Sequence, residues 1–329
     1  MVRVGVIGLG IGERHVQEYL KLEGVQVAAV ADIARERAEQ VARRYGIARA
    51  YASGPEMLEG ERLEAVSICT TPRSHRELVL AAAERGLHIL CEKPMAPALA
   101  DCDDMIAACE RVGVTLLLGF KKRSSLPFRF LKSQEGEWGC PRTAQVRYQL
   151  GPVQKDWFWD EVDGGGPLVE NTAHAFDMLR FLLGEAERVY AEGSNHFAPG
   201  RDVPSEAVCT LRFASGSLVS LIAGAGGIWA YDASEHWVLN YDRLNAELHG
   251  PFDSPRRLRL MQRDGQTIEE RWWQEATGWP EQMRHFLDCV RGQAEPRATG
   301  EDGKRALQLS LAVRESIRRG APVTVDLSI

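Results

Sequence analysis

The sequence lacks long apolar runs and an excess of positive charge. No apolar stretch approaches the roughly 20 residues that a helix needs to cross a bilayer, so we expect no membrane-spanning segment. The first residues do not show the sequence of a charged region, an apolar core and a cleavage site, so we expect no secretory signal. With 40 Lys and Arg against 46 Asp and Glu, the formal net charge of -6 argues against a nucleic-acid partner.

Paired cysteines are also missing. The 7 cysteines are an odd number, and no two of them stand in a CxxC pair. We therefore expect neither a zinc site nor a disulfide framework, and no metal. Reduced thiols in a cytoplasmic protein are the expectation.

What is present is typical of a globular protein. Hydrophobic residues make up 44% of the chain and charged residues 26%, so there is enough apolar material for packed cores. A chain of 329 residues is long for one core, and we predict two domains. A change of pattern near residue 120 places them at 1–120 and 121–329.

The first 120 residues alternate between short apolar runs and helical periodicity. We predict strands at 2–8, 25–31, 65–69, 88–91 and 115–119, with helices at 13–22, 34–45, 73–85 and 99–111. Strands that are apolar throughout, separated by helices, indicate a parallel sheet covered on both faces. This is the pattern of an α/β Rossmann domain with a doubly wound sheet.

After residue 120 the strand signals follow one another with few helices between them. We predict strands at 143–150, 189–193, 206–213, 217–223, 235–241, 245–248, 258–262 and 323–326, and helices at 167–183, 282–291 and 301–319. This succession predicts an α+β domain with an open, mainly antiparallel sheet.

A glycine-rich turn follows the first predicted strand. Gly8, Gly10 and Gly12 let the backbone approach a pyrophosphate, whose charge then sits at the helix N-terminus. Asp32 ends the second strand, where its carboxylate can accept hydrogen bonds from the adenosine ribose of NAD and repel a 2′-phosphate. The alternative is an ordinary strand-end Asp, and Arg35 and Arg37 close behind leave NADP open.

Two further segments follow parallel strands at their carboxyl ends, where ligands of open α/β sheets bind. One is Glu92-Lys93-Pro94, and the other runs from Thr70 through Thr71 to His75. A lysine there can act as a proton relay to the oxygen of an alcohol that loses hydride. The alternative for Lys93 is a solvated surface residue.

A glycine run precedes the helix predicted at 167–183. Glu170, His174 and Asp177 are spaced to share one face of that helix, so a His flanked by carboxylates could serve as a general base. The alternative is a structural histidine whose hydrogen bonds are satisfied within a capped helix start. The basic residues 121–123 either bring charge to the site or form a solvated turn, and the aromatic residues 157–159 either stack on a sugar or line the core.

Together these segments resemble the Gfo/Idh/MocA oxidoreductase family, which includes inositol and sugar dehydrogenases. The resemblance covers nearly the whole chain and rests on the glycine turn ending in His15, on Asp32, and on the segments at 69–75, 92–94, 119–120 and 164–177. It implies an NAD(P)-dependent enzyme that moves hydride to or from a hydroxyl-bearing carbon of a sugar or polyol. It also implies a cis Lys93–Pro94 bond and a homo-oligomer, dimer or tetramer, formed through the C-terminal sheet.

The resemblance assigns roles to residues of this sequence. Lys93, His174 and Glu170 would be catalytic, and Lys121 and Asp177 would join these three in contacting the substrate. The cofactor-binding set would be Gly8, Gly10, Ile11, Gly12, Asp32, Thr70, Thr71, His75, Glu92 and Lys93.

This chain departs from the family's usual pattern at three points. Glu170 stands where the family usually has Asp, the third glycine comes one position early, and Thr71-Pro72 replaces the more familiar Pro-Asn. Two other functions fit the same cofactor domain. One is an NAD-dependent glycosidase that oxidises its substrate transiently, and the other is a regulator that binds NAD(P) without turnover.

Overall fold

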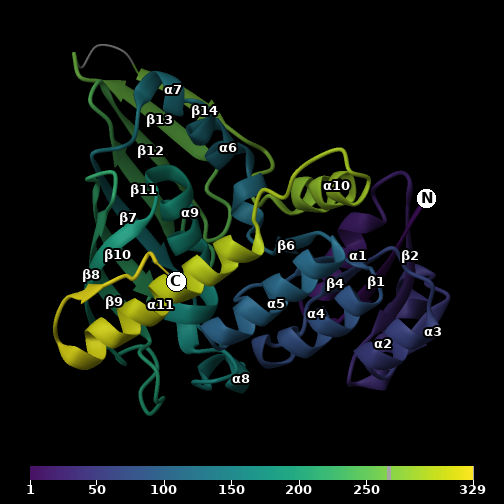
Figure 1. The fold of residues 1–329 in the computed structure, drawn as a ribbon. Coiled ribbons are helices and arrows are strands. Elements are labelled where there is room, and N and C mark those ends of the chain that lie inside the picture. The colour runs from purple at the N-terminus through teal and green to yellow at the C-terminus, as the bar shows by residue number, and fades with distance from the viewer. Residues whose placement is uncertain (265–267, 329) are drawn as a thin grey trace. The chain divides into compact units, whose positions relative to one another are not determined.

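The computed structural model describes residues 1–264 and 268–328 (Figure 1). The chain divides into two compact units by packing. The first comprises Met1–Ser124 and Trp279–Lys304, and the second comprises Ser125–Gly278 and Arg305–Ile329. The expected division between residues 120 and 121 stays a prediction, and the packing adds a C-terminal segment to the first unit.

The first unit contains a six-stranded sheet in the order β3-β2-β1-β4-β5-β6. Its strands are β1 (Val2–Ile7), β2 (Val25–Ala31), β3 (Arg49–Tyr51), β4 (Ala65–Ile68), β5 (His88–Cys91) and β6 (Leu116–Leu118). Every pairing in it is parallel, and this confirms the predicted doubly wound sheet. The strand order reverses beside β1, which is where open α/β sheets bind their ligands.

Helices follow most strands of the first unit. They are α1 (Gly12–Tyr19), α2 (Arg35–Tyr45), α3 (Gly54–Gly60), α4 (His75–Glu84), α5 (Leu99–Val112) and α10 (Trp279–Val290), with a short helical turn at Pro72–Ser74. Figure 1 shows α10 beside α1, and the two helices pack together although they are far apart in the sequence. Trp279, Met283 and Phe286 of α10 join the core of the parallel sheet.

The second unit contains a nine-stranded sheet in the order β14-β13-β12-β11-β7-β10-β9-β8-β15. Its strands are β7 (Thr143–Gln149), β8 (Ala186–Ser194), β9 (Glu206–Phe213), β10 (Leu218–Gly224), β11 (Glu235–Asn240), β12 (Leu244–Gly250), β13 (Arg257–Gln262), β14 (Ile268–Trp272) and β15 (Val323–Thr324). Only β7 and β10 pair in parallel among these described strands. The predicted open, mainly antiparallel sheet is confirmed.

One face of this sheet is covered. The helices of this part of the chain are α6 (Leu126–Ser133), α7 (Glu135–Trp138), α8 (Asp156–Trp159), α9 (Ala173–Leu183) and α11 (Gly300–Arg319). Phe176 and Leu179 of α9 share a buried cluster with inward-facing strand residues such as Leu211 and Trp237. Side chains alternate between buried and exposed along β9, because successive residues of a strand point to opposite faces.

The helix predicted at 167–183 is not continuous. A wide π-type turn covers Pro167–Asn171, and α9 begins only at Ala173. Both the backbone N–H and the hydroxyl of Thr172 donate to the carbonyl oxygen of Pro167, each at 2.8 Å. This bond spans five residues, so the segment begins with a turn wider than an α-helix, and regular α-helical spacing starts only with α9.

Among the described residues, no helix combines the length and the apolar character that crossing a membrane requires.

Candidate active site

Five strand ends of the first unit lie in register and bring separate segments to one edge. Ile7 pairs with Ala31 and with Ile68, and Ile68 pairs with Cys91. Cys91 in turn pairs with Leu118. The next residue on each strand therefore forms a row at the carboxyl edge of the sheet, namely Asp32, Gly8, Cys69, Glu92 and Gly119.

The glycine turn begins in this row. Gly8 has φ +83°, and a Cβ atom on it would lie 2.7 Å from the carbonyl oxygen of Cys69. Only glycine fits there, because both the backbone conformation and the neighbouring strand exclude a side chain. A Cβ on Gly10 would meet nothing within 4 Å, and Gly10 is exposed. The turn is thus packed at its first glycine and open at its second.

Asp32 ties the turn to the end of β2. Its Oδ2 accepts the backbone N–H of Leu9 at 2.8 Å, and its Oδ1 accepts that of Ala34 at 2.9 Å. Each carboxylate oxygen keeps a second lone pair for a further donor. Ile11 precedes α1 without a capping side chain. A helix start without a side-chain cap, an open glycine and a half-buried carboxylate fit the pyrophosphate and ribose of a dinucleotide.

The second turn, after β4, is held by its own side chains. The Ser74 hydroxyl donates to Thr70 Oγ1 at 2.8 Å and contacts the Thr71 carbonyl oxygen at 3.0 Å. His75 is fully buried, with its ring nitrogens each 3.1 Å from the carbonyl oxygens of Met95 and Thr70. Burial lowers the pKa of His75, although the carbonyls oppose that shift. His75 therefore joins this turn to the loop that follows Lys93.

The third segment places a half-buried lysine beside a buried acid. The Lys93–Pro94 bond is cis, as the resemblance implied. Glu92 is only 4% exposed, and its Oε2 accepts the backbone N–H of Lys93 at 3.1 Å. Burial alone would raise the pKa of Glu92, but the hydrogen bond from His15 and the charge of Lys93 outweigh it and leave this pKa below its usual value.

The basic run after β6 is buried. Lys121, Lys122 and Arg123 are 4%, 1% and 7% exposed, so the alternative of a solvated turn is wrong. The ammonium group of Lys121 lies 4.8 Å from the ring centre of Trp279, a cation–π contact. Arg123 donates to Asp302 and to the carbonyl oxygen of Arg297, both at 2.7 Å.

The second unit carries the other predicted catalytic residues. Glu170 lies in the π-type turn and is partly exposed, whereas His174, in the first turn of α9, is 5% exposed. Asp177 is fully buried with a carboxylate oxygen 3.7 Å from Arg180 Nη1, and Arg180 also donates to Glu185. Asp177 thus has a structural partner within its own helix.

The aromatic run at 157–159 belongs mostly to a core. Phe158 and Trp159 are 3% and 5% exposed and share a buried cluster with Leu150, Val203 and Ala225. The indole N–H of Trp159 donates to the carbonyl oxygen of Val153 at 2.9 Å. Of the two alternatives left open for these side chains, the core packing is the one that the structure supports.

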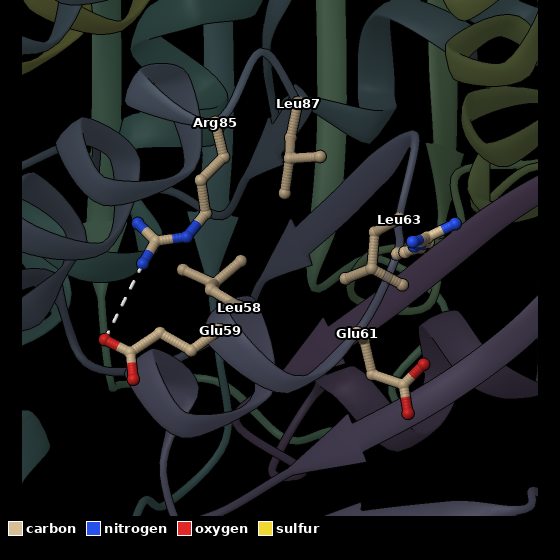
Figure 2. A pocket seen from close by; sticks show the side chains of 7 residues that line it. Leu58, Glu59, Glu61, Leu63, Arg85 and Leu87 are labelled. Atoms are coloured by element: carbon tan, nitrogen blue, oxygen red, sulfur yellow. Dashed lines mark ion pairs between the residues drawn. The ribbon is translucent and has the colours of Figure 1, made fainter.

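Two surface hollows lie in the described part of the first unit, one beside α3 and one beside α2. Figure 2 shows the first, of about 410 Å³, lined by Leu58, Glu59, Glu61, Arg62, Leu63, Arg85 and Leu87, with Arg85 3.7 Å from Glu59. Leu63 and Leu87 precede β4 and β5, so this hollow is at the amino edge of the sheet. The second, of about 420 Å³, lies between α1 and α2 and includes Arg37.

Comparisons with known proteins decide the family. Residues 2–120 match the model described as "Oxidoreductase family, NAD-binding Rossmann fold", and residues 133–241 match "GFO/IDH/MocA C-terminal domain". The chain is 30% identical to myo-inositol 2-dehydrogenase of Thermotoga maritima over 99% of both chains. The chain belongs to the Gfo/Idh/MocA oxidoreductase family.

Other relatives of this oxidoreductase extend the comparison. It is 28% identical to D-apiose dehydrogenase of Paraburkholderia graminis, over 97% of this chain and 88% of that protein. The crystal structure of a probable dehydrogenase from Thermotoga maritima matches with a TM-score of 0.83 and 28% identity over 100% of both chains. The predicted fold, the NAD-binding Rossmann domain and an oxidoreductase acting on CH–OH groups are thereby confirmed.

The sequence alone did not reveal the surroundings of Glu92. His15 was noted only as the end of the glycine turn, and its contact with Glu92 spans 77 residues. Trp279 was one of several tryptophans without an assigned place, yet it lies at this edge against His15 and Lys121. A histidine in the first helix after a glycine turn is the one signal that could have directed attention there.

Proposed function

We propose that this oxidoreductase transfers hydride between NAD(H) and a hydroxyl-bearing carbon of a sugar or polyol, with Lys93 and His174 handling the hydroxyl proton. The bound nicotinamide would supply the hydride acceptor or donor. The relatives named above, a myo-inositol and a D-apiose dehydrogenase, support the substrate class.

One observation carries the proposal. Lys93 is half-buried immediately after Glu92, at the same sheet edge as the open glycine turn and Asp32. An ammonium group beside an ionised carboxylate can stabilise the negative charge of a substrate alkoxide. It can also exchange a proton with the alkoxide oxygen. Lys93 would hold the reacting oxygen, Lys93 and His174 would together take or return its proton, and Glu170 would supply the negative charge that the family usually draws from Asp.

The remaining predicted residues would bind and orient. The backbone of Gly10 and Ile11 would face the pyrophosphate, and Asp32 would accept the ribose hydroxyls. Thr70 and Thr71 would border the cofactor from the second turn, while Gly12, Glu92 and His75 would shape the surrounding loops. Lys121 and Asp177 remain proposed substrate contacts.

A substrate screen tests the function. Purified protein is mixed with NAD⁺ or NADP⁺ and with inositols, aldoses and the corresponding acids, and the absorbance of the reduced cofactor is recorded. Turnover of at least one member supports the proposal. Release of sugar from a glycoside without net reduction of the cofactor would instead indicate the glycosidase reaction, and binding without turnover would indicate a regulator.

Asp32 is expected to set the cofactor preference. In Asp32→Asn, the loss of a charged acceptor should weaken NAD⁺ binding by about tenfold or more, whereas NADP⁺ binding should strengthen because repulsion of its phosphate is removed. Fluorescence titration of both cofactors measures the two Kd values. An NADP⁺ preference already present in the unaltered protein would contradict the role of Asp32.

The two glycines Gly8 and Gly10 form a matched pair. Gly8→Ala should lower the free energy of unfolding by about 2 kcal/mol, because its positive φ and its contact with Cys69 exclude a Cβ. Gly10→Ala should leave unfolding unchanged within about 0.5 kcal/mol, since the new methyl group meets nothing, but should weaken NADH binding. Denaturant melts and NADH titrations separate the two effects. Unchanged NADH affinity in Gly10→Ala would argue against pyrophosphate contact there.

We propose that the protein forms a homo-oligomer, either a dimer or a tetramer, through the exposed face of the nine-stranded sheet. Val208 and Ile222 are cross-strand partners that remain 54% and 42% exposed, and Leu218 on the same strand as Ile222 is 46% exposed. Exposed apolar side chains gathered on one face of a sheet are typical of an interface. Ile222→Lys should then give a smaller species than the unaltered protein in sedimentation, and an unchanged monomer in both would overturn the proposal.

The cytoplasm is the proposed location. All seven cysteines are free thiols, and six of them are buried, as expected for a reducing compartment.

A further inference from the structure

The buried environment of His15 suggests a task that the family assignment does not give it. His15 is fully buried on α1, and its Nε2 lies 3.2 Å from Glu92 Oε1. Its Nδ1 lies 3.5 Å from the sulfur of Cys69, at the end of β4. The ring edge also contacts Trp279, with centroids 5.3 Å apart at 65°. His15 therefore connects three of the elements that build the candidate site.

The thiol of Cys69 is the partner of the second ring nitrogen of His15. Burial raises the pKa of this thiol well above its usual value, so the sulfur keeps its proton. In the neutral tautomer that carries its ring proton on Nε2, His15 accepts the S–H at Nδ1 and donates to Glu92 Oε1. One chain of bonds thus runs from Cys69 through His15 to the carboxylate.

The carboxylate of Glu92 has a partner at each oxygen and a close neighbour beside them. One oxygen accepts His15, and the other accepts the backbone N–H of Lys93 at 3.1 Å. A Cβ on Gly119 would lie 2.6 Å from the carboxylate, so the end of β6 closes the remaining side. A buried carboxylate without such partners would be costly and would reorient or take up a proton. The position and charge of Glu92 thus depend on His15.

We propose that His15 is a positioning residue that acts through Glu92, fixing the carboxylate beside Lys93 and thereby the site of proton transfer. This inference rests on the proposed role of Lys93. It extends that role to a histidine of the dinucleotide-binding helix. Because His15 follows the glycine turn on the same helix, cofactor binding at the turn and the placement of Lys93 share one rigid element.

Two variants of His15 test the proposal. His15→Gln retains an N–H donor that can reach Glu92, whereas His15→Leu is similar in size but donates nothing. In cofactor-free protein carrying ¹³C-labelled glutamate, the carboxyl signal of Glu92, assigned with Glu92→Gln, should titrate at higher pH in His15→Leu than in the unaltered protein. His15→Gln should restore most of the original titration.

Kinetics then separate positioning from packing. His15→Leu should lower kcat about tenfold, with a smaller change in substrate KM and a shifted pH profile, and His15→Gln should recover kcat to within about threefold. If His15→Leu does not fold, Cys69→Ala removes only the partner of Nδ1 and should shift the Glu92 titration in the same direction by less.

The outcomes distinguish a positioning role of His15 from a purely structural one. A Glu92 titration that does not move in either variant overturns the proposal, as does a moved titration with unchanged kcat, which would make the pair purely structural. Because the titration needs neither cofactor nor substrate, it stays informative if the proposed sugar or polyol chemistry fails.

Discussion

Lys93→Met should lower kcat by about a thousandfold, the largest loss expected from a single side chain of this protein. Methionine is similar in length and apolar, so it removes the ammonium group from the carboxyl end of β5 with little change in volume. The hydroxyl proton then has no donor or acceptor at that position. Initial rates with the best substrate of the screen, with both cofactor and substrate at saturation, measure the effect.

Lys93→Arg separates charge from proton transfer. Arginine keeps a positive charge but does not lose its proton in proteins. If Lys93 exchanges a proton with the substrate, Lys93→Arg should be nearly as inactive as Lys93→Met. Recovery to within about tenfold of the original rate would mean that charge alone suffices, and the proton would have to travel by His174.

Controls distinguish a chemical defect from a binding or folding defect. Lys21→Met makes the same exchange at a lysine whose side chain is 61% exposed and paired with Glu18, and its kcat should be unchanged. NADH affinity of Lys93→Met should stay within about tenfold of the original value. Turnover by Lys93→Met at more than a third of the original rate would remove Lys93 from the mechanism.

The parallel sheet could be predicted because its strands have apolar sequences that match their burial on both faces of the sheet. β2 and β5 were predicted at the residues where they occur, since both are mainly apolar and are followed by helices. β3 and α3 were missed. β3 has only three residues, exposed or half-buried, so it carries no periodicity to recognise.

The π-type turn at Pro167–Asn171 shows what a spacing rule cannot capture. Proline lacks a backbone N–H, and the Thr172 hydroxyl offers its carbonyl a second donor, so the turn widens. The apolar residues alone suggested one regular helix. A local hydrogen bond outside the α-helical ladder therefore divided the predicted helix just before α9.

The sequence predicted which segments form the candidate site, but it did not predict the side-chain contacts within the site. The carboxyl-edge positions of Asp32 and Glu92 follow from the parallel strands that the sequence predicted. The contact between His15 and Glu92 and the burial of Lys122 could not be predicted, because they depend on side chains that meet only after folding. Charged residues in a sequence are normally expected at the solvent-exposed surface. The burial of a basic run can be predicted only when the groups that pair with it are known.

His174→Asn should lower kcat by about a hundredfold or more, because the imidazole at the start of α9 is the proposed base for the hydroxyl proton. Asparagine keeps polar atoms of similar reach but cannot exchange a proton at neutral pH. Since His174 is 5% exposed, thermal melts and circular dichroism of the variant must show that the fold is retained. The deuterium isotope effect on hydride transfer should change together with kcat.

The double variant Lys93→Met/His174→Asn decides whether the two residues serve one proton. Residues that act as a unit show non-additive losses, so the double variant should be little worse than Lys93→Met alone. Losses that multiply would mean that Lys93 and His174 act in independent steps, for example one in binding and one in chemistry. A His174→Asn variant with unchanged kcat would assign the proton to Lys93, and the role of His174 would then reduce to orienting the substrate.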